Sequence, residues 1–197
     1  MNKRKIILAS GSPRRQELLR MLEIPNLEIH PAQGEEKAPD GLGPAETAVE
    51  LARTKAEAVF RDCRDEMESG ALIIAADTVV WLDGRILGKP HSERDAVQML
   101  HALSGRSHEV HTGVVLRDLD GELAESECST VFFRQLTDDE ILRYVASGEP
   151  MDKAGAYGAQ EKGSLFVRRI EGDFFNVMGL PLCRLGQMLI RKGVSIL

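Results

Sequence analysis

The hydrophobic pattern of the chain alternates between short apolar runs and stretches of helical spacing. It predicts strands at 4–9 and 26–32, a helix at 13–23 and a longer helix at 44–61. The long helix carries an apolar stripe formed by Ala48, Ala52, Ala56 and Val59. The near-continuous apolar run ALIIAADTVVWL at 71–82 is typical of a strand buried on both faces.

Turn residues predict how the following strands are joined. Asp83-Gly84 and the LDG stretch at 119–121 each favour a hairpin. Two further short strands are expected around EGD at 171–173. Strand–helix units combined with hairpins predict an α/β fold, with a mixed sheet that carries helices on both faces. Because no linker interrupts the pattern, residues 1–197 are expected to form a single domain.

Helix caps define the remaining helices. Ser12 is a candidate N-cap that precedes Pro13, and Ser92 is a candidate N-cap for a helix that ends near Gly105. Thr137 with Glu140 three residues later forms a capping-box pattern. A last helix is expected to start at Pro181.

The charge balance limits the classes of partner. The chain has 25 Lys and Arg against 31 Asp and Glu, a net charge of −6. This balance argues against broad electrostatic binding of nucleic acid or of an anionic membrane. No apolar run reaches the roughly 18 residues that a membrane helix requires. Any basic residues that converge on one site would therefore bind a compact anion.

Cysteines and histidines give no metal signature in the sequence. Cys63, Cys128 and Cys183 are far apart and odd in number, which is typical of reduced thiols in a cytoplasmic protein. His108 and His111 lie on opposite faces of a predicted strand and have no third ligand at metal spacing. A zinc site is therefore not predicted here.

The stretch LASGSPRR at 8–15 combines the end of a strand, a turn of small residues and the start of a helix. Free backbone N–H groups and the helix dipole favour an anion at such a point. Ser10 and Ser12 add hydroxyl donors, and Arg14 and Arg15 add planar cationic groups suited to phosphate. The alternative is a capped helix whose first-turn arginines are solvated.

Asp77 interrupts an apolar run, where a carboxylate is costly unless it is paired, metal-bound or at the end of a strand. A strand at 72–76 would place Asp77 and Thr78 at its carboxyl end, where α/β proteins gather their ligands. Asp77 is then a metal ligand or a general base. The alternative is a carboxylate that caps a local turn.

Other polar residues are ambiguous when taken alone. Glu35 and Glu36 are typical of charged residues on the protein surface. Lys55 is typical of a lysine whose side chain extends from its helix to solvent. Lys89 follows a hairpin and has no predicted direction. In DKAGAYGAQ at 152–160, the side chains of Tyr157 and Gln160 could contact a nucleobase. The alternative is that this stretch is a tight glycine-rich turn.

Six stretches of the chain, in this order, resemble the Maf family. They are LASGSPRRQELL at 8–19, AADTVV at 75–80, GKP at 88–90, LSGRSHEVHTGV at 103–114, DKAGAYGAQ at 152–160 and VMGLPL at 177–182. The likeness extends over nearly the whole chain. The version GEPMDKAGAYG is most similar to the branch of the family that acts on dTTP and UTP.

The resemblance implies a nucleoside triphosphate pyrophosphatase, which releases a nucleoside monophosphate and pyrophosphate with the help of Mg²⁺ or Mn²⁺. It implies the fold of the inosine triphosphate pyrophosphatases, an elongated mixed sheet with two lobes and a central cleft. A homodimer, a cytoplasmic location, and links to division arrest and to the removal of modified nucleotides are also implied.

Site roles follow from the motifs that match. Asp77 corresponds to the proton acceptor and a metal ligand, Glu36 to a second catalytic acidic residue that also binds the metal, and Glu35 to a weaker candidate for that position. The positions that resemble phosphate-binding residues are Ser10, Arg15, Lys55 and Lys89, of which Lys89 is also counted as catalytic. The positions that resemble determinants of base choice are Arg14, Thr78 and Gln160.

Two other functions fit part of the pattern. A nucleotidyltransferase also opens with a strand and an arginine-bearing small-residue loop, but it requires a second substrate. A non-enzymatic regulator of cell division would bind nucleotides without turning them over. The joint presence of Asp77, Lys89 and Arg15 favours the enzyme.

Overall fold

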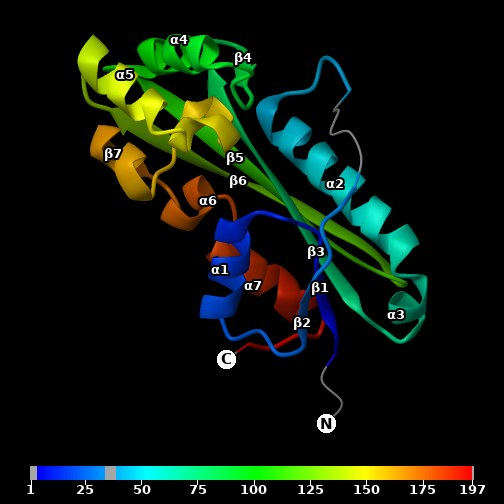
Figure 1. Cartoon of the computed structure of the whole chain (residues 1–197). Helices are drawn as coiled ribbons and strands as arrows, with labels where there is room; N and C mark the ends of the chain where they lie inside the picture. The colour runs from blue at the N-terminus through cyan, green and yellow to red at the C-terminus, as the bar shows by residue number, and fades with distance from the viewer. Residues whose placement is uncertain (1–3, 34–38, 197) are drawn as a thin grey trace.

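The computed structural model describes residues 4–33 and 39–196 (Figure 1). These residues form one mixed sheet of seven strands. The strands are β1 (Ile6–Leu8), β2 (Leu27–Ile29), β3 (Leu72–Leu82), β4 (Arg85–Leu87), β5 (Ser107–Asp118), β6 (Gly121–Phe133) and β7 (Val167–Glu171). The helices are α1 (Pro13–Met21), α2 (Pro44–Asp62), α3 (Arg64–Glu68), α4 (Glu93–Leu103), α5 (Asp138–Ala146), α6 (Phe174–Met178) and α7 (Leu182–Arg191). The described residues also form three 3₁₀ turns, η1 (Glu149–Asp152), η2 (Ala154–Ala156) and η3 (Glu161–Phe166).

The sheet has the strand order β2-β1-β3-β5-β6-β7, with β4 as a further partner of β3. β1 is parallel to β2 and to β3, whereas the other pairs are antiparallel. β1 and β4 share one edge of β3: β1 pairs as far as Ile74, and β4 begins to pair at Val80. Among the described residues no strand pairs with the stretch between them, so β3 has a gap on this edge.

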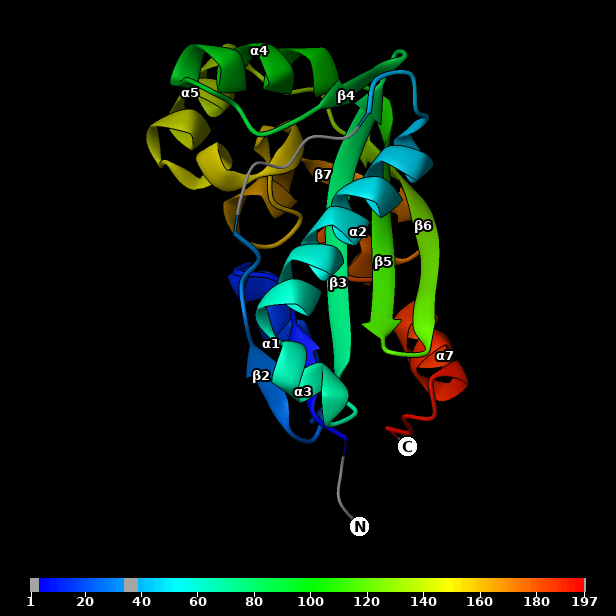
Figure 2. The same cartoon turned by 90° about the vertical axis from the view of Figure 1, so that its right-hand side faces the viewer.

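Helices cover both faces of the sheet, and the alternation along β3 explains how. Ile73 and Ala75 pack under α2, where the predicted stripe of Ala52, Ala56 and Val59 is buried. Figure 2 shows α2 lying along β3 and β5. The opposite face carries α1 and α7 at one end and α4 and α5 at the other (Figure 1). The predicted fold class, a mixed sheet with helices on both faces, is confirmed.

Two apolar clusters follow each other along this opposite face. The first joins β1 and β3 to α1 and α7 through residues such as Leu8, Ile74 and Leu185. The second joins the far part of β3 to α4 and α5 through residues such as Val80 and Leu100. The gap on β3 lies between the two clusters, which gives the two-lobed arrangement.

Both predicted hairpins are present. Asp83 and Gly84 have φ values of 50° and 78°, as a tight β3–β4 turn requires. The β5–β6 hairpin closes between Asp118 and Gly121. The predicted caps also form: Ser92 accepts a hydrogen bond from the backbone N–H of Asp95, and the capping box of α5 is complete.

The apolar run at 71–82 forms β3 (Leu72–Leu82), as predicted, but two other local expectations are wrong. The strand does not end at residue 76, so Asp77 lies in the middle of a strand and not at its carboxyl end. Its polar character is tolerated there because it falls at the gap in the edge pairing. The second strand expected after EGD is instead α6, because the carboxylate of Asp173 accepts a hydrogen bond from the N–H of Phe175 at 2.7 Å and caps a helix.

Candidate active site

A pocket of about 420 Å³ opens at the gap in the edge of β3. It is lined by the end of β1, the start of α1, the middle of β3, the loop after β4 and the segment from η1 to η3. Because Asp77 and Thr78 are consecutive in a strand, they point to opposite faces of the sheet, yet both reach the gap. Because no strand of the described residues covers this edge of β3, the pocket is lined by side chains from both faces of the sheet.

Arg15 lies at the base of this pocket, with only 7% of its surface exposed. Its Nε donates to the carbonyl oxygen of Gly179 at 2.7 Å, and its terminal nitrogens donate to Ser10 Oγ at 3.3 Å and to Thr78 Oγ1 at 3.1 Å. These acceptors come from the turn between β1 and α1, from β3 and from the end of α6. The guanidinium is thus oriented before any ligand arrives.

The hydroxyl of Thr78 belongs to a chain of hydrogen bonds that extends into the protein. Thr112 Oγ1 lies 2.9 Å from Thr78 Oγ1 and donates to the carbonyl of Asn176 at 2.9 Å. Asn176 is fully buried, and its amide donates to Val110 O and to Ser129 Oγ. This chain anchors α6, and α6 in turn positions the carbonyl of Gly179 that Arg15 binds.

On the other face of β3, Asp77 forms an ion pair with Lys55 of α2. The distance between Lys55 Nζ and Asp77 Oδ2 is 2.5 Å, and both side chains are nearly buried. Asp77 Oδ1 accepts from the N–H of Thr78 at 2.7 Å. The ion pair compensates the cost of burying each charge, and it aims the carboxylate at the pocket.

Gly113 allows α2 to approach this pair. It is the β5 partner of Asp77, and a Cβ at Gly113 would lie 2.4 Å from backbone atoms of Ala48 and Val49. No side chain larger than hydrogen fits between the strand and the helix. The distance from Lys55 to Asp77 therefore depends on this glycine.

The start of α1 also faces the pocket. Ser12 occupies the predicted N-cap position, but its side chain makes no capping hydrogen bond. Instead its backbone N–H donates to Ser10 Oγ at 3.3 Å. A helix start whose N-cap side chain makes no capping hydrogen bond suits an anion, as the sequence predicts.

Lys89 is exposed at the opposite rim of the pocket. The preceding residue, Gly88, accepts a hydrogen bond from the N–H of Gly155 at 3.0 Å. Gly155 has φ 69°, and a Cβ there would lie 3.0–3.2 Å from the side chain of Val80. The GKP loop is therefore tied to η2 rather than extended into solvent.

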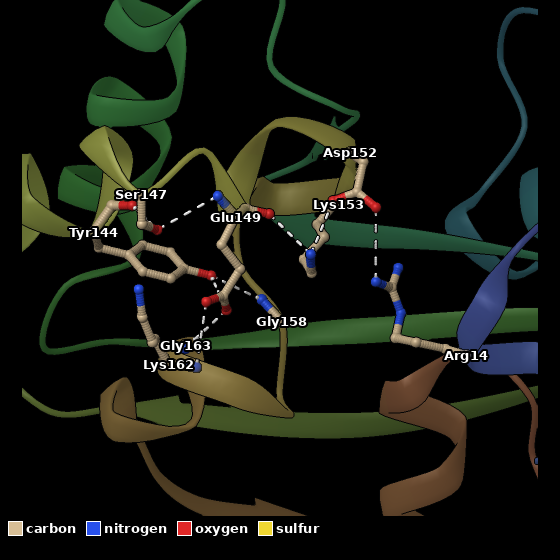
Figure 3. Close-up of polar contacts among 9 residues, drawn as sticks. All are labelled: Arg14, Tyr144, Ser147, Glu149, Asp152, Lys153, Gly158, Lys162 and Gly163. Carbon is tan, nitrogen blue, oxygen red and sulfur yellow. Dashed lines mark hydrogen bonds and ion pairs between the residues drawn. The ribbon is translucent and has the colours of Figure 1, made fainter. Parts of the chain in front are cut away.

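The remaining part of the pocket wall is a polar network, shown in Figure 3. Asp152 lies between two cations: its Oδ2 is 3.9 Å from Arg14 Nη1, and its Oδ1 accepts from Lys153 Nζ at 2.8 Å. Lys153 is buried and also donates to the carbonyl of Glu149 at 2.8 Å. The network holds the half-buried side chain of Arg14 against the pocket wall.

Glu149 connects the loop from 158 to 163 to α5 (Figure 3). Its carboxylate accepts from the hydroxyl of Tyr144 at 3.0 Å and from the N–H groups of Lys162 and Gly163 at 3.3 and 3.1 Å. Burial, with a contribution from the Glu149 carboxylate, raises the pKa of Tyr144 and keeps it protonated as a donor. This loop carries Gln160 at the pocket rim.

The structure brings most of the predicted residues to one pocket. Its lining includes Ser10, Arg14, Arg15, Lys55, Asp77, Thr78, Lys89 and Gln160. Glu35 and Glu36 lie outside the described residues. Tyr157 also lines the pocket, but its hydroxyl is bonded to His108 Nε2 at 2.7 Å, so it has turned away from a base.

Sequence reasoning missed Glu149, Asp152 and Lys153. The last two belong to a motif that was singled out for its small residues, and their charges were not assigned a role. The signal that could have found them is an adjacent Asp-Lys pair inside a glycine-rich stretch, where isolated charges are costly.

The pocket also has donors that suit a divalent cation. Asp77 offers carboxylate oxygens at the gap, and a carboxylate can accept more contacts than the Lys55 and Thr78 bonds use. Mg²⁺ is commonly bound by one or two carboxylates together with substrate phosphates. The described residues therefore fit a metal that arrives with a phosphorylated ligand.

Comparison with protein families matches residues 5–192 to the family described as Maf-like protein. The chain belongs to the Maf family. Its relatives include a Syntrophomonas wolfei protein named dTTP/UTP pyrophosphatase, 51% identical over 96% of this chain and 98% of that one. A Carboxydothermus hydrogenoformans protein of the same name is also 51% identical, over 96% and 99%. A Methanosarcina mazei protein of that name is 47% identical over 98% and 96%.

Among solved structures, the Maf chain is similar to the Staphylococcus aureus Ham1 protein with a TM-score of 0.48 and 15% identity, covering 97% of this chain and 100% of that one. Within the part of the Maf chain that the structure describes, every helix is too short or too polar to cross a membrane.

Proposed function

We propose that this Maf protein hydrolyses dTTP and UTP to the nucleoside monophosphate and pyrophosphate. The observation that carries the proposal is the composition of the gap pocket, where Arg15, Lys55 and Lys89 meet one buried carboxylate, Asp77. Cations around a buried carboxylate suit a polyphosphate whose hydrolysis needs a base. The names of the relatives that align over nearly their full length support the choice of substrate.

The triphosphate would lie between the start of α1 and the GKP loop. Arg15 is already oriented by Gly179, Ser10 and Thr78, so it binds phosphate without reorganising. The first-turn N–H groups of α1 supply further donors. Lys89 at the opposite rim would neutralise charge on the departing pyrophosphate.

Asp77 is the group that would accept the proton. The oxygen of a water molecule attacks the α-phosphorus, the bond from that phosphorus to the bridging oxygen of the β-phosphate breaks, and the proton of the water passes to the Asp77 carboxylate. Lys55 holds Asp77 in place on the α2 side of the sheet. General-base catalysis of this kind contributes about 10²- to 10⁴-fold to the rate.

A Mg²⁺ or Mn²⁺ ion would be held by Asp77 together with substrate phosphates, and Glu36, by resemblance, is proposed as a second ligand. When bound, the ion supplies Lewis-acid neutralisation of the phosphate charge. The choice between the two ions, and a homodimeric assembly, are further predictions from the family resemblance.

The base would contact the wall formed by Arg14, Asp152 and Gln160. Asp152 orients Arg14, and Gln160 offers both a donor and an acceptor to a pyrimidine edge. Thr78, which the resemblance assigns to base choice, is bonded to Arg15, so its effect on specificity would be indirect.

The decisive experiment is a hydrolysis screen with dTTP, UTP, CTP, GTP and ATP, in which pyrophosphate and phosphate are measured separately. We expect pyrophosphate from dTTP and UTP, and a loss of at least about 100-fold in kcat for Asp77→Asn. Asp120→Asn, at an exposed hairpin turn, is the matched control and should retain full activity.

Two results would count against the proposal. Phosphate as the first product would mean that a different bond is cleaved. Binding of dTTP without any turnover would favour a nucleotide-binding regulator, and turnover only with an added alcohol or sugar phosphate would favour a transferase.

A further inference from the structure

A second group of chemically reactive side chains lies outside the nucleotide pocket. Glu109 and His111 are two residues apart on β5, and Cys128 is the register partner of His111 on β6. His111 is also the partner of Val79, so the group is on the α2 face of the sheet. None of the three residues lines the pocket.

The ligand atoms of these side chains converge. His111 Nε2 is 2.8 Å from Glu109 Oε2 and 3.6 Å from Cys128 Sγ, and the ligand atoms all lie within 4.8 Å of one another. The sequence alone gave no third ligand near His111, because Cys128 is 17 residues away and reaches it only through strand pairing.

These separations are close to those of a tetrahedral metal site. With Zn–N near 2.05 Å and Zn–S near 2.3 Å, tetrahedral angles place the nitrogen and sulfur about 3.6 Å apart. That is the separation between His111 and Cys128. The nitrogen–oxygen separation would be about 3.4 Å, so the carboxylate of Glu109 would have to retreat by about 0.6 Å. Its side chain is 48% exposed and has room to do so.

The donor types select the kind of cation. A thiolate, an imidazole and a carboxylate suit Zn²⁺ and related ions, whereas Mg²⁺ and Mn²⁺ favour sites made of oxygen alone. Cys128 is exposed, which gives an ion a path to the site, and three ligands leave a fourth position for water.

We propose that Glu109, His111 and Cys128 form a binding site for a thiophilic divalent cation of the Zn²⁺ class, separate from the nucleotide pocket. A bound ion would join β5 to β6 across their pairing and stabilise the folded state. Among the described residues, the Nδ1 atom of His111 has no hydrogen-bond partner. A hydrogen bond to the second ring nitrogen of a metal-binding histidine commonly raises the affinity for the metal by about 10- to 100-fold. Without it, the ion is expected to exchange readily.

The test is a titration of the full chain with Co²⁺, followed by absorption spectroscopy. Co²⁺ bound by a thiolate gives a sulfur-to-metal charge-transfer band, and carboxylate sites do not. We expect this band in the wild type, and its loss on addition of Zn²⁺ but not of excess Mg²⁺. Cys128→Ser and His111→Gln should abolish it, and Glu109→Gln should weaken binding by about tenfold or more.

Two matched variants separate this site from others. Cys183→Ser removes another exposed cysteine, on α7, and should keep the band. Asp77→Asn removes the carboxylate of the nucleotide pocket and should also keep it. Circular dichroism of each variant without metal establishes that it is folded.

The proposal is overturned if the wild type shows no band, if the band survives in folded Cys128→Ser, or if it disappears in Cys183→Ser. If Glu109, His111 and Cys128 only form hydrogen bonds with one another and bind no metal, the wild type would show no band. Because the readout is spectroscopic, it is independent of whether the protein hydrolyses nucleotides.

Discussion

Replacement of Glu149 by alanine tests whether the loop from 158 to 163 must be held in place for base recognition. In the folded protein, the Glu149 carboxylate is the acceptor for Tyr144, Lys162 and Gly163. Alanine removes both oxygens and leaves the backbone path of η1 unchanged. The loop that carries Gln160 then loses its bonds to Glu149 and keeps the bond from the N–H of Gly158 to the Tyr144 hydroxyl of α5, at 3.2 Å.

The size of the effect follows from the burial of the donors. A hydrogen bond to a charged group contributes about 1.5–3 kcal/mol, and water replaces it where the donor is exposed. Lys162 is exposed, so its bond contributes little, whereas Tyr144 and Gly163 are buried. The bond from Gly163 is the buried one that holds the loop itself, so we expect about 1.5–3 kcal/mol less stabilisation of the ordered loop.

Steady-state kinetics with dTTP and UTP measure the consequence. If binding the substrate must reorder the loop, KM rises by about 10- to 100-fold while kcat changes little. The preference for pyrimidine over purine triphosphates should fall in parallel. Glu149→Gln, which keeps one neutral acceptor, should lie between the wild type and Glu149→Ala. Glu68→Ala, at an exposed site on α3, is the matched control.

A purely structural role would give a different pattern. Glu149→Ala would then lower the melting temperature while KM and base preference stayed at their wild-type values. That result would refute a positioning role for Glu149, even if the variant were less stable.

Four further perturbations test other parts of the structure. Burial lowers the pKa of His108 to about 4 in the folded protein, so below pH 6.5 the unfolded chain binds a proton that the folded protein does not. The free energy of unfolding, measured by urea titration, should therefore fall by about 3 kcal/mol between pH 6.5 and 4. His108→Gln should remove this contribution to the pH dependence. Arg15→Lys cannot reproduce the planar contacts to Gly179 and Thr78, and kcat/KM for dTTP should fall by about 10²- to 10³-fold; a change below threefold would contradict the phosphate role. Gly113→Ala must push α2 away from β5, so it should cost about 1–3 kcal/mol by denaturant unfolding and lower kcat as well. Removal of divalent cations with a chelator should abolish turnover, and Mg²⁺ should restore it; turnover that persists in the chelator would exclude the metal.

The sequence predicted elements best where the local pattern and the tertiary environment agree. The alanine stripe of α2 and the caps at Ser92 and Thr137 needed no knowledge of their neighbours. The apolar run at 71–82 predicted the extent of β3, but the position of Asp77 at the carboxyl end of a strand was wrong, because the cost of burying Asp77 depends on the edge gap and only the pairing of β1 and β4 creates that gap. Likewise, the turn at EGD favours a hairpin locally, but Asp173 caps α6.

The sequence predicted several of the residues that line the pocket, but not which residues each of them contacts. Arg15 and Asp77 were assigned to the same site from their motifs, yet the separation of Asp77 and Thr78 onto opposite faces follows only from their place inside a continuous strand. The link from Glu149 to the loop at 158–163, and the pairing of His111 with Cys128, both join segments that sequence spacing leaves unrelated.

The continuous strand at the centre of the pocket also bears on which insertions and deletions the chain can accept. Asp77 faces Lys55 and Thr78 faces Arg15 only because β3 keeps one register between its two neighbours. One residue added between Ala71 and Asp77 would exchange the two faces, and both halves of the site would be lost together. One residue added at the exposed Asp83-Gly84 turn would leave β3 in register. The distant hairpins that fix this register are therefore as necessary to the chemistry as the side chains that line the pocket.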